Sequence, residues 1–256
     1  MLAMVATTSI AQELPPDVDL EIVLAVDGSG SIDAGEYRLQ LAGYADALRD
    51  PGVQAAALSG PLGKVAVATM VWSDAAFRKF ETDWFVIDSH EAADRYADIV
   101  EVFYHHSGRT VGMGGGGTGI GSGIEYALRM MEENGIAAQR RTIDVSGDGI
   151  ETDPWFREAV QLPEARDMAD AAGVTVNGLA ILTDFAALDR YYEDEVITGP
   201  GAFVIVADDF DDFAGAIRRK LWLEFSSPVA ERRPALPARA VGAIDRATVA
   251  AATDQP

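Results

Sequence analysis

The stretch Glu21–Ile32, EIVLAVDGSGSI, joins an apolar run to a loop in which glycine alternates with oxygen-bearing side chains. The run Ile22–Val26 is short, β-branched and closed by glycine, a pattern that predicts a buried parallel strand. Asp33 follows as a candidate helix N-cap, and Glu36 stands at the capping-box spacing behind it. The stretch therefore predicts a strand, a tight loop and a helix in succession.

Three side chains of this loop carry oxygen: Asp27, Ser29 and Ser31. Alternate residues of an extended loop face the same way, and Gly28 and Gly30 let the backbone curl so that all three point at one centre. One carboxylate and two hydroxyls are hard donors, which suit Mg²⁺, Mn²⁺ or Ca²⁺ and suit zinc poorly. The loop also follows the carboxyl end of a strand, where open α/β sheets bind ligands. Taken alone, the pentapeptide is equally consistent with a turn that only reverses the chain.

The composition excludes several classes of protein. The chain has 256 residues, 48% of them hydrophobic, and a formal charge of −21 from 20 basic and 41 acidic residues. It lacks the basic footprint that holds nucleic acid by its phosphates. The charge would attract cations and basic surfaces, although solubility or life at high ionic strength explains it equally well. There is no cysteine, which excludes disulfides and thiolate metal sites. No apolar stretch is long enough to predict a transmembrane segment.

The two ends of the chain differ from its middle. Residues 1–17 have the pattern of a signal-peptide remnant and lead-in: an apolar start, then Ser9 and Ala11 in the small-x-small arrangement that precedes cleavage, here before Gln12. The apolar part is short and no basic residue precedes it, so either the true start lies upstream or the segment is not a signal. A signal would place the protein in the periplasm or outside the cell. Residues 227–256 are rich in Pro, Ala and Arg, which predicts a disordered tail.

The folded domain is expected over residues 18–226, where apolar runs alternate with helical patterns. We expect buried strands at Ile22–Val26, Lys64–Trp72, Arg140–Ser146, Val174–Leu182 and Ala202–Ala207. Helices are expected over Ala34–Arg49, Ser89–Phe103, Gly119–Glu133, Pro154–Ala172 with a break at Pro163, Phe185–Glu193 and Asp208–Glu224. The alternating segment Arg78–Ile87 predicts an antiparallel edge strand. The fold class is therefore α/β: a doubly wound, mostly parallel sheet with one antiparallel edge strand and helices on both faces.

Asp144 is an acidic residue in the middle of a strand that is expected to be buried. A buried carboxylate needs a partner. We expect Arg140 or Arg141 to pair with it, rather than a metal role for Asp144.

Two further polar side chains stand at the same edge of the expected sheet. Thr118 follows the glycine-rich loop 105–117 and precedes a helix, and Asp148 follows a strand. In a doubly wound sheet both positions lie near Asp27. The candidate site then holds two carboxylates and three hydroxyls, from Asp27, Ser29, Ser31, Thr118 and Asp148. Five hard oxygen ligands leave room for a sixth, as octahedral Mg²⁺ requires.

The three loops resemble the metal-ion-dependent adhesion site (MIDAS) of von Willebrand factor type A (vWA) domains. That pattern is Asp-x-Ser-x-Ser, then a distant Thr, then a distant Asp-Gly, and it is matched here by Asp27–Ser31, Thr118 and Asp148-Gly149. The resemblance covers about residues 18–226 and implies a vWA/Rossmann-like fold. Two departures, Gly147 before Asp148 and Gly119 after Thr118, remove no ligand. The phrases IDVSGDG (143–149), VNGL (176–179) and GPGAF (199–203) resemble an uncharacterised family of exported bacterial vWA-like proteins.

The resemblance implies a binding module and not an enzyme. In the family the serines and the threonine ligate the ion directly when a partner is bound, the aspartates act largely through water, and an open position takes an Asp or Glu carboxylate of a protein partner. The alternative is a metal-dependent hydrolase or phosphotransferase with Asp27 as nucleophile. That chemistry requires an acid two residues later, where this chain has Ser29, and no lysine stands near Asp148.

Overall fold

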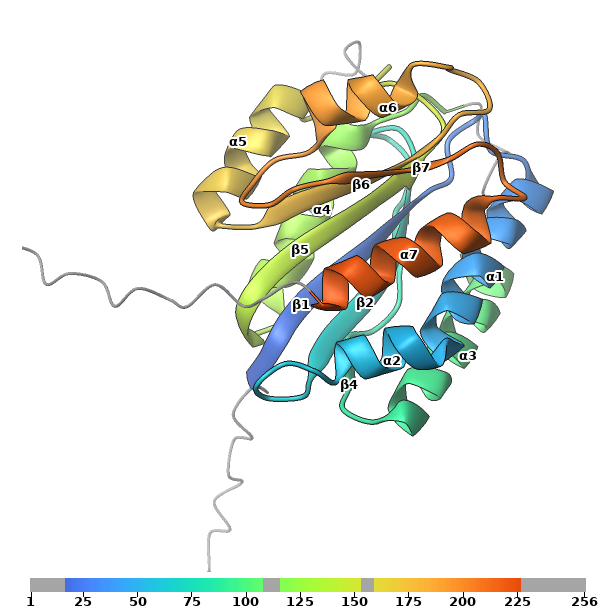
Figure 1. The fold of residues 1–256 in the computed structure, drawn as a ribbon. Helices are drawn as coiled ribbons and strands as arrows, with labels where there is room; N and C mark the ends of the chain where they lie inside the picture. The colour runs from blue at the N-terminus through green and yellow to red at the C-terminus, as the bar shows by residue number, and fades with distance from the viewer. Residues whose placement is uncertain (1–16, 108–115, 153–158, 227–256) are drawn as a thin grey trace, which may run out of the picture.

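The structure is a computed structural model, and it describes residues 17–107, 116–152 and 159–226 (Figure 1). Its centre is a seven-stranded sheet in the order β3-β2-β1-β5-β6-β7, with β4 also paired to β2. The strands are β1 (Asp17–Asp27), β2 (Val65–Trp72), β3 (Phe80–Glu81), β4 (Phe85–Ile87), β5 (Ala137–Gly147), β6 (Thr175–Ile181) and β7 (Val204–Ala207). β3 and β4 run antiparallel to β2, and the other pairings between strands are parallel. The mostly parallel α/β fold expected from the sequence is confirmed.

Helices cover both faces of this sheet, as Figure 1 shows. One face is covered by α1 (Ala34–Arg49), α2 (Pro51–Ala57), α3 (His90–Ser107) and α7 (Phe213–Ser226). The other face is covered by α4 (Ile120–Glu133), α5 (Leu162–Ala172), α6 (Leu188–Tyr191) and the π-helical turn η1 (Tyr192–Val196). Among the described residues, every helix is too short or too polar to cross a membrane.

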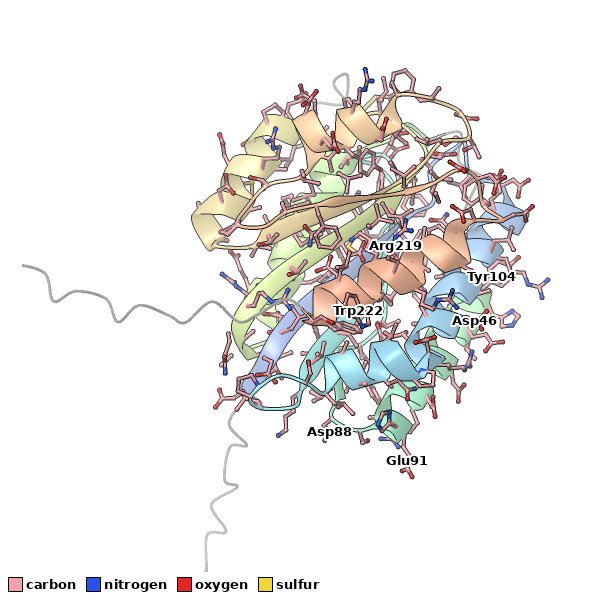
Figure 2. All side chains as sticks on the ribbon, in the orientation of Figure 1. Asp46, Asp88, Glu91, Tyr104, Arg219 and Trp222 are labelled. Carbon is pink, nitrogen blue, oxygen red and sulfur yellow. The ribbon has the colours of Figure 1, made fainter. Side chains whose placement is uncertain are left out.

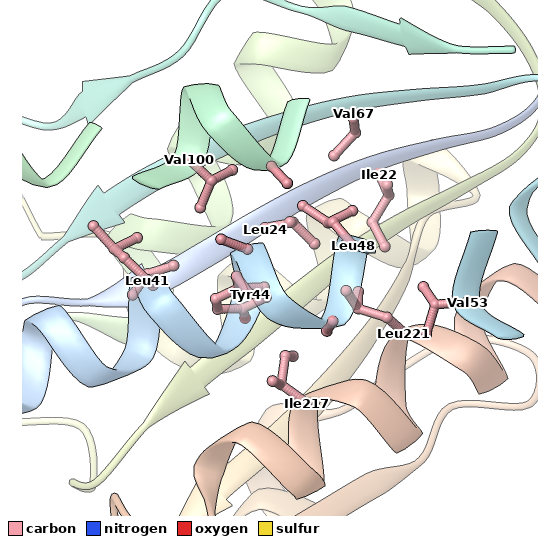
Figure 3. Packing of buried hydrophobic residues seen from close by; sticks show 14 of the residues in the cluster. Ile22, Leu24, Leu41, Tyr44, Leu48, Val53, Val67, Val100, Ile217 and Leu221 are labelled. Atoms are coloured by element: carbon pink, nitrogen blue, oxygen red, sulfur yellow. The ribbon is translucent and has the colours of Figure 1, made fainter. Parts of the chain in front are cut away.

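The core follows the alternation of β1. Its even-numbered residues, such as Ile22 and Leu24, contact the layer of α1 and α7, whereas Val23 and Ala25 contact the layer of α4. Figure 3 shows the first layer, in which Leu41, Tyr44 and Leu48 of α1 meet Ile217 and Leu221 of α7 below the sheet residues. Because both faces of β1 are buried, the strand needs the continuous apolar run seen in the sequence.

Asp33 fixes the start of α1 and with it the end of the DGSGS loop. Its Oδ1 accepts the amides of Gly35 (2.6 Å) and Glu36 (2.9 Å), and Glu36 Oε2 accepts the amide of Asp33 (2.8 Å). This is the capping box that the sequence predicts.

Several element boundaries differ from the sequence prediction. The expected edge strand forms as two pieces, β3 and β4, because the Thr82 hydroxyl accepts the Thr69 amide (3.0 Å) in place of a main-chain partner. α3 continues to Ser107, whose hydroxyl bonds the Phe103 carbonyl (2.8 Å) and the Tyr37 hydroxyl (2.6 Å). α5 begins at Leu162, so Pro163 lies in its first turn and does not interrupt it. The signal segment and the C-terminal tail predicted from the sequence, and part of the helix predicted from Pro154, fall in residues 1–16, 227–256 and 153–158, which lie outside the described residues.

The prediction that Arg140 or Arg141 pairs with Asp144 was wrong. The Nζ of Lys220 on α7 lies 2.8 Å from Asp144 Oδ1 and 3.1 Å from Glu224 Oε1, and all three side chains are buried. Instead, Arg140 Nη1 lies 4.0 Å from Glu224 Oε2, and Arg140 also donates to the main-chain carbonyl of Glu224. Arg141 donates to the main-chain carbonyl of Ala172. Even-numbered residues of β5 face α7, which is why the cation comes from that helix.

Candidate metal centre

The candidate site lies where the winding of the sheet reverses. β1 has β2 on one side and β5 on the other, and the connections to these strands pass over opposite faces. The carboxyl ends of β1 and β5 therefore form the crevice in which such sheets bind ligands. Asp27 ends β1, Asp148 directly follows β5, and Val26 is in register with Ser146. Both carboxylates are buried, with exposed fractions of 0% and 1%.

The DGSGS loop joins these two aspartates through hydrogen bonds. The amide of Ser29 donates to Asp27 Oδ1 (2.7 Å). The hydroxyls of Ser29 and Ser31 lie 3.2 Å apart, and the Ser31 hydroxyl donates to Asp148 Oδ1 (2.7 Å). The loop thus turns its alternate side chains toward one centre, as the sequence pattern predicts.

Thr118 approaches the same place from a third loop. Its Oγ1 is 3.1 Å from where a Cβ on Gly149 would lie, so a side chain at 149 would require Thr118 to move back slightly. The amide of Thr118 donates to Thr152 Oγ1 (2.7 Å), and its carbonyl accepts the Thr152 amide (2.8 Å). The amide of Gly30 donates to the carbonyl of Gly116 (3.1 Å) and so ties the first loop to the third. The structure therefore brings all five predicted residues to one edge of the sheet.

The electrostatics of the site show a shortage of positive charge. Burial, and then the nearby Asp148, raise the pKa of Asp27 to about 7, against hydrogen bonds from Ser29 that lower it. Burial also raises the pKa of Asp148, which the Ser31 hydrogen bond lowers and Asp184 and Glu36 raise further. Asp27 Oδ2 is buried and has no hydrogen-bond partner among the described residues. An unpaired buried carboxylate oxygen is costly unless a cation or a donor reaches it.

The donors present fit a hard divalent cation. The described residues contain no group of three or more His, Cys, Asp or Glu side chains that could hold a metal. A cation at this edge would therefore depend on the hydroxyls of Ser29, Ser31 and Thr118 as well as on the two carboxylates. Such an all-oxygen set suits Mg²⁺, Mn²⁺ or Ca²⁺ better than softer ions.

Two residues that the sequence did not single out lie close to Asp27, although the Tyr192 hydroxyl has no hydrogen-bond partner among the described residues. The side chain of Gln40 on α1 donates to the main-chain carbonyl of Asp27 (3.2 Å). A polar glutamine on the buried face of a helix could have indicated this role from the sequence. The hydroxyl of Tyr192 and Asp27 Oδ2 both lie beside Gly147, 2.8 and 2.7 Å from where its Cβ would be. Burial, and then Asp27, raise the pKa of Tyr192 well above its usual value. Nothing local in the sequence distinguishes Tyr192 from an ordinary core tyrosine.

The topology gives the chain a vWA/Rossmann-like α/β fold, a class of fold with a mostly parallel sheet between two layers of helices. Within that class it belongs to the family described as "Protein of unknown function (DUF1194)", whose model matches residues 17–229. The comparison with curated proteins found no match.

Several solved structures share the fold at low sequence identity. The pilus adhesin SpaC from Lactobacillus rhamnosus GG is 14% identical with a TM-score of 0.51, and the match covers 81% of this chain and 31% of that one. The vWF domain of the type V pili tip protein Mfa5 from Porphyromonas gingivalis is 11% identical (TM-score 0.50; 83% and 98% covered). Proximal thread matrix protein 1 from the mussel byssus, with a zinc-occupied MIDAS motif, is 15% identical (TM-score 0.50; 83% and 49% covered). The chain thus spans about a third to a half of SpaC and the byssus protein but nearly all of the Mfa5 domain. At these identities the likeness shows the fold alone.

Proposed function

We propose that this protein is an exported, metal-dependent binding module that engages an acidic group of a protein partner through a divalent cation, for adhesion or assembly. Asp27, Ser29, Ser31, Thr118 and Asp148 would hold the ion, which we expect to be Mg²⁺, with Mn²⁺ or Ca²⁺ as substitutes. The observation that carries the proposal is the unpaired Oδ2 of Asp27, buried beside the second carboxylate of Asp148. A divalent cation would neutralise both charges at once.

The exposure of the five side chains indicates how a partner would approach. Asp27, Ser29 and Asp148 are buried, Thr118 is 7% exposed, and Ser31 is exposed. When bound, the ion would supply an electrophilic centre for a partner carboxylate. Ser31 and Thr118 would flank that carboxylate at the open side, while the two aspartates hold the charge from below. The burial of Asp27 strengthens its interaction with the ion, because the local dielectric constant is low.

The alternative, hydrolysis or phosphoryl transfer with Asp27 as nucleophile, finds no support in the geometry. Ser29 occupies the place of a second acid, and its amide donates to Asp27. The three lysines have other contacts or places: Lys79 donates to the Asp74 carbonyl, Lys220 pairs with Asp144, and Lys64 directly precedes β2, at the end of that strand opposite to the site. We therefore propose a binding protein and not an enzyme.

The neighbours support this proposal through what their titles say. SpaC is a pilus adhesin, Mfa5 is a pilus tip protein, and the byssus protein holds zinc in its MIDAS motif. Pilus proteins act outside the cytoplasm, which agrees with the export expected from residues 1–17. The zinc makes the choice of ion an experimental question, so Zn²⁺ belongs in the titration.

Calorimetric titration of Mg²⁺, Mn²⁺, Ca²⁺ and Zn²⁺ tests the site. Wild type should bind one ion, and Asp27→Asn should lose that binding, because half of the negative charge at the centre is removed. Asp46→Asn is the matched control: it makes the same charge change on an exposed residue of α1 and should bind the ion like wild type. Unchanged affinity in Asp27→Asn would refute the site.

Affinity capture from the native host, in Mg²⁺ and in EDTA, tests the function. Partner capture should require the ion and fail in Asp27→Asn. Thr118→Ala should weaken capture more than ion binding, because the resemblance assigns direct ligation by threonine to the engaged state. If EDTA does not affect capture, any bound ion is structural and the partner binds at another surface.

A further inference from the structure

A groove of about 550 Å³ lies beside the candidate metal centre, between α4 and the segment that joins β2 to β3. Arg78 and Phe80 line one wall, and Tyr126 and Arg129 line the other. The groove follows the helix that begins just after Thr118. At 1.5 Å per residue, Arg129 lies about 15 Å along that axis from Thr118. The candidate metal centre and the groove thus both lie along α4, one at its start and the other beside its side chains.

Each wall presents an arginine that is stacked on an aromatic ring. The guanidinium carbon of Arg78 lies 5.6 Å from the centre of the Phe80 ring, and that of Arg129 lies 4.8 Å from the centre of the Tyr126 ring. Stacking holds a guanidinium in place and leaves its N–H edge for a carboxylate. Arg129 has a loose ion pair with Glu125 (3.7 Å) and is 48% exposed. Within the described part of the chain, no carboxylate forms an ion pair with Arg78.

The lining of the groove carries a net positive charge, although the whole molecule is strongly acidic. Its lining has three cations, Arg78, Lys79 and Arg129, against two acids, Glu81 and Glu125, whereas the whole chain carries −21. The Glu81 carboxylate already accepts a hydrogen bond from the Tyr126 hydroxyl (3.0 Å). An acidic ligand would be repelled by most of this surface and attracted here, so charge complementarity selects the occupant.

We propose that this groove binds an extended, acidic segment of the same partner whose carboxylate binds the metal, with an aromatic side chain packed on Tyr126. The Tyr126 ring lines the groove and is partly exposed, whereas the rings of Phe77 and Phe80 pack against the core layer of α1 and α3 on the other face of the sheet. The proposal rests on the proposed function of the metal centre. An extended chain advances about 3.3 Å per residue, so 15 Å places the acidic segment about five residues from the metal-binding carboxylate.

Fluorescence anisotropy with labelled synthetic peptides tests the groove. The probes have a Glu-Phe-Glu, Lys-Phe-Lys or Glu-Ala-Glu centre in a Gly/Ser context. Glu-Phe-Glu should bind, and the other two should bind at least about tenfold more weakly, since each lacks one of the two matched features. Arg78→Gln with Arg129→Gln should weaken Glu-Phe-Glu binding to a similar degree.

Arg218→Gln with Arg219→Gln is the matched control, because it makes the same charge change on α7, across the sheet from α4. Figure 2 shows Arg219 on that helix beside the exposed Trp222. This control should bind the peptide like wild type. The proposal for the groove would be overturned if Lys-Phe-Lys bound as tightly as Glu-Phe-Glu, or if both double variants lost the same affinity for Glu-Phe-Glu.

A longer peptide separates this proposal from that of the metal centre. It adds an aspartate about five residues before or after the Glu-Phe-Glu centre, and both orders are tested. In Mn²⁺ one order should gain about tenfold or more over the short peptide by engaging both sites. EDTA or Asp27→Asn should remove only that gain. If the arginine variants lower affinity but EDTA does not, the groove stands and the metal proposal fails; the converse result refutes the groove alone.

Discussion

Gly147 lacks a side chain at the one place on β5 where a side chain would displace the Asp27 carboxylate. A Cβ there would lie 2.7 Å from Asp27 Oδ2 and 2.8 Å from the Tyr192 hydroxyl, both closer than real carbon contacts. The Ser-Gly-Asp-Gly form of this loop, which looks like a departure in the sequence, therefore has a steric cause. It lets β5 run directly beside the candidate ligand.

Gly147→Ala should disturb Asp27 and Tyr192 together. We expect a loss of about 1–3 kcal/mol in the free energy of unfolding, the usual cost of overpacking. Mn²⁺ affinity should fall as well, because Asp27 must turn away. Chemical denaturation and calorimetry measure the two effects. Gly215→Ala is the control, since its Cβ would meet nothing nearer than 3.7 Å, and it should leave Mn²⁺ affinity unchanged.

The raised pKa of Asp27, about 7, makes stability without metal depend on pH. The unfolded value is about 3.9, so between roughly pH 4 and 7 the folded state holds a proton that the unfolded state has lost. Stability in EDTA should therefore fall as pH rises through this window. Asp27→Asn should lack this contribution, so the difference in melting temperature between the two proteins should change with pH. A constant difference would contradict the raised pKa.

At the scale of elements, most strands and helices could be predicted because their apolar periods match their burial on both faces of the sheet. The errors fall where side chains, and not periodicity, decide. Thr82 divides the edge strand through its hydroxyl, and the Ser107–Tyr37 hydrogen bond extends α3. The acidic turn 208–212 was expected as helix, but α7 begins at Phe213; Asp212 Oδ2 and Asp209 Oδ1 accept turn amides there. Such contacts are invisible to a helical or strand template.

α7 and β5 share a buried cluster of charges that the sequence did not reveal. Lys220 directly follows two arginines, Arg218 and Arg219, yet its exposed fraction is 0%. It faces Asp144 and Glu224, and Asn177 donates to Glu224 Oε1 (2.8 Å). The spacing of Ile217, Lys220 and Leu221 puts the lysine on the apolar face of the helix, which was the missed signal.

Lys220→Met should strongly destabilise the protein, because it leaves the buried Asp144 without its cation and leaves Glu224 with only the more distant Arg140. We expect a loss of about 3–5 kcal/mol, measured by denaturant unfolding. Adding Asp144→Leu should restore much of it, since one unpaired charge is removed and apolar groups fill the space. A loss below about 1 kcal/mol for the single variant would show that the cluster is not held by Lys220.

At the scale of the whole molecule, the sequence could predict the candidate metal residues but not the groove beside them. The five site residues follow strand ends and one helix start, and topology alone gathers such positions at one edge. The groove instead depends on arginines stacked on aromatic rings from two elements about fifty residues apart in the chain. Their pairing depends on how α4 packs, where Gly123 lies against Trp72. No local pattern encodes that contact.

A divalent ion would act on the whole domain, because it would join loops that follow β1 and β5 and precede α4. An ion at a hundredfold excess over its Kd adds about 2.7 kcal/mol to the free energy of unfolding. For a domain of this size that raises Tm by roughly 5–10 °C. Differential scanning calorimetry with Mg²⁺ or Mn²⁺ measures the shift.

The charge of −21 complicates this test, since any cation screens repulsion within so acidic a chain and raises Tm somewhat. Two controls separate screening from binding. NaCl at matched ionic strength gives the screening contribution in wild type. Asp27→Asn keeps nearly all of the surface charge but removes one candidate ligand, so Mg²⁺ should raise its Tm only as far as NaCl does. If Mg²⁺ raises the Tm of Asp27→Asn as much as that of wild type, relative to NaCl, the stabilising ion binds somewhere other than at Asp27.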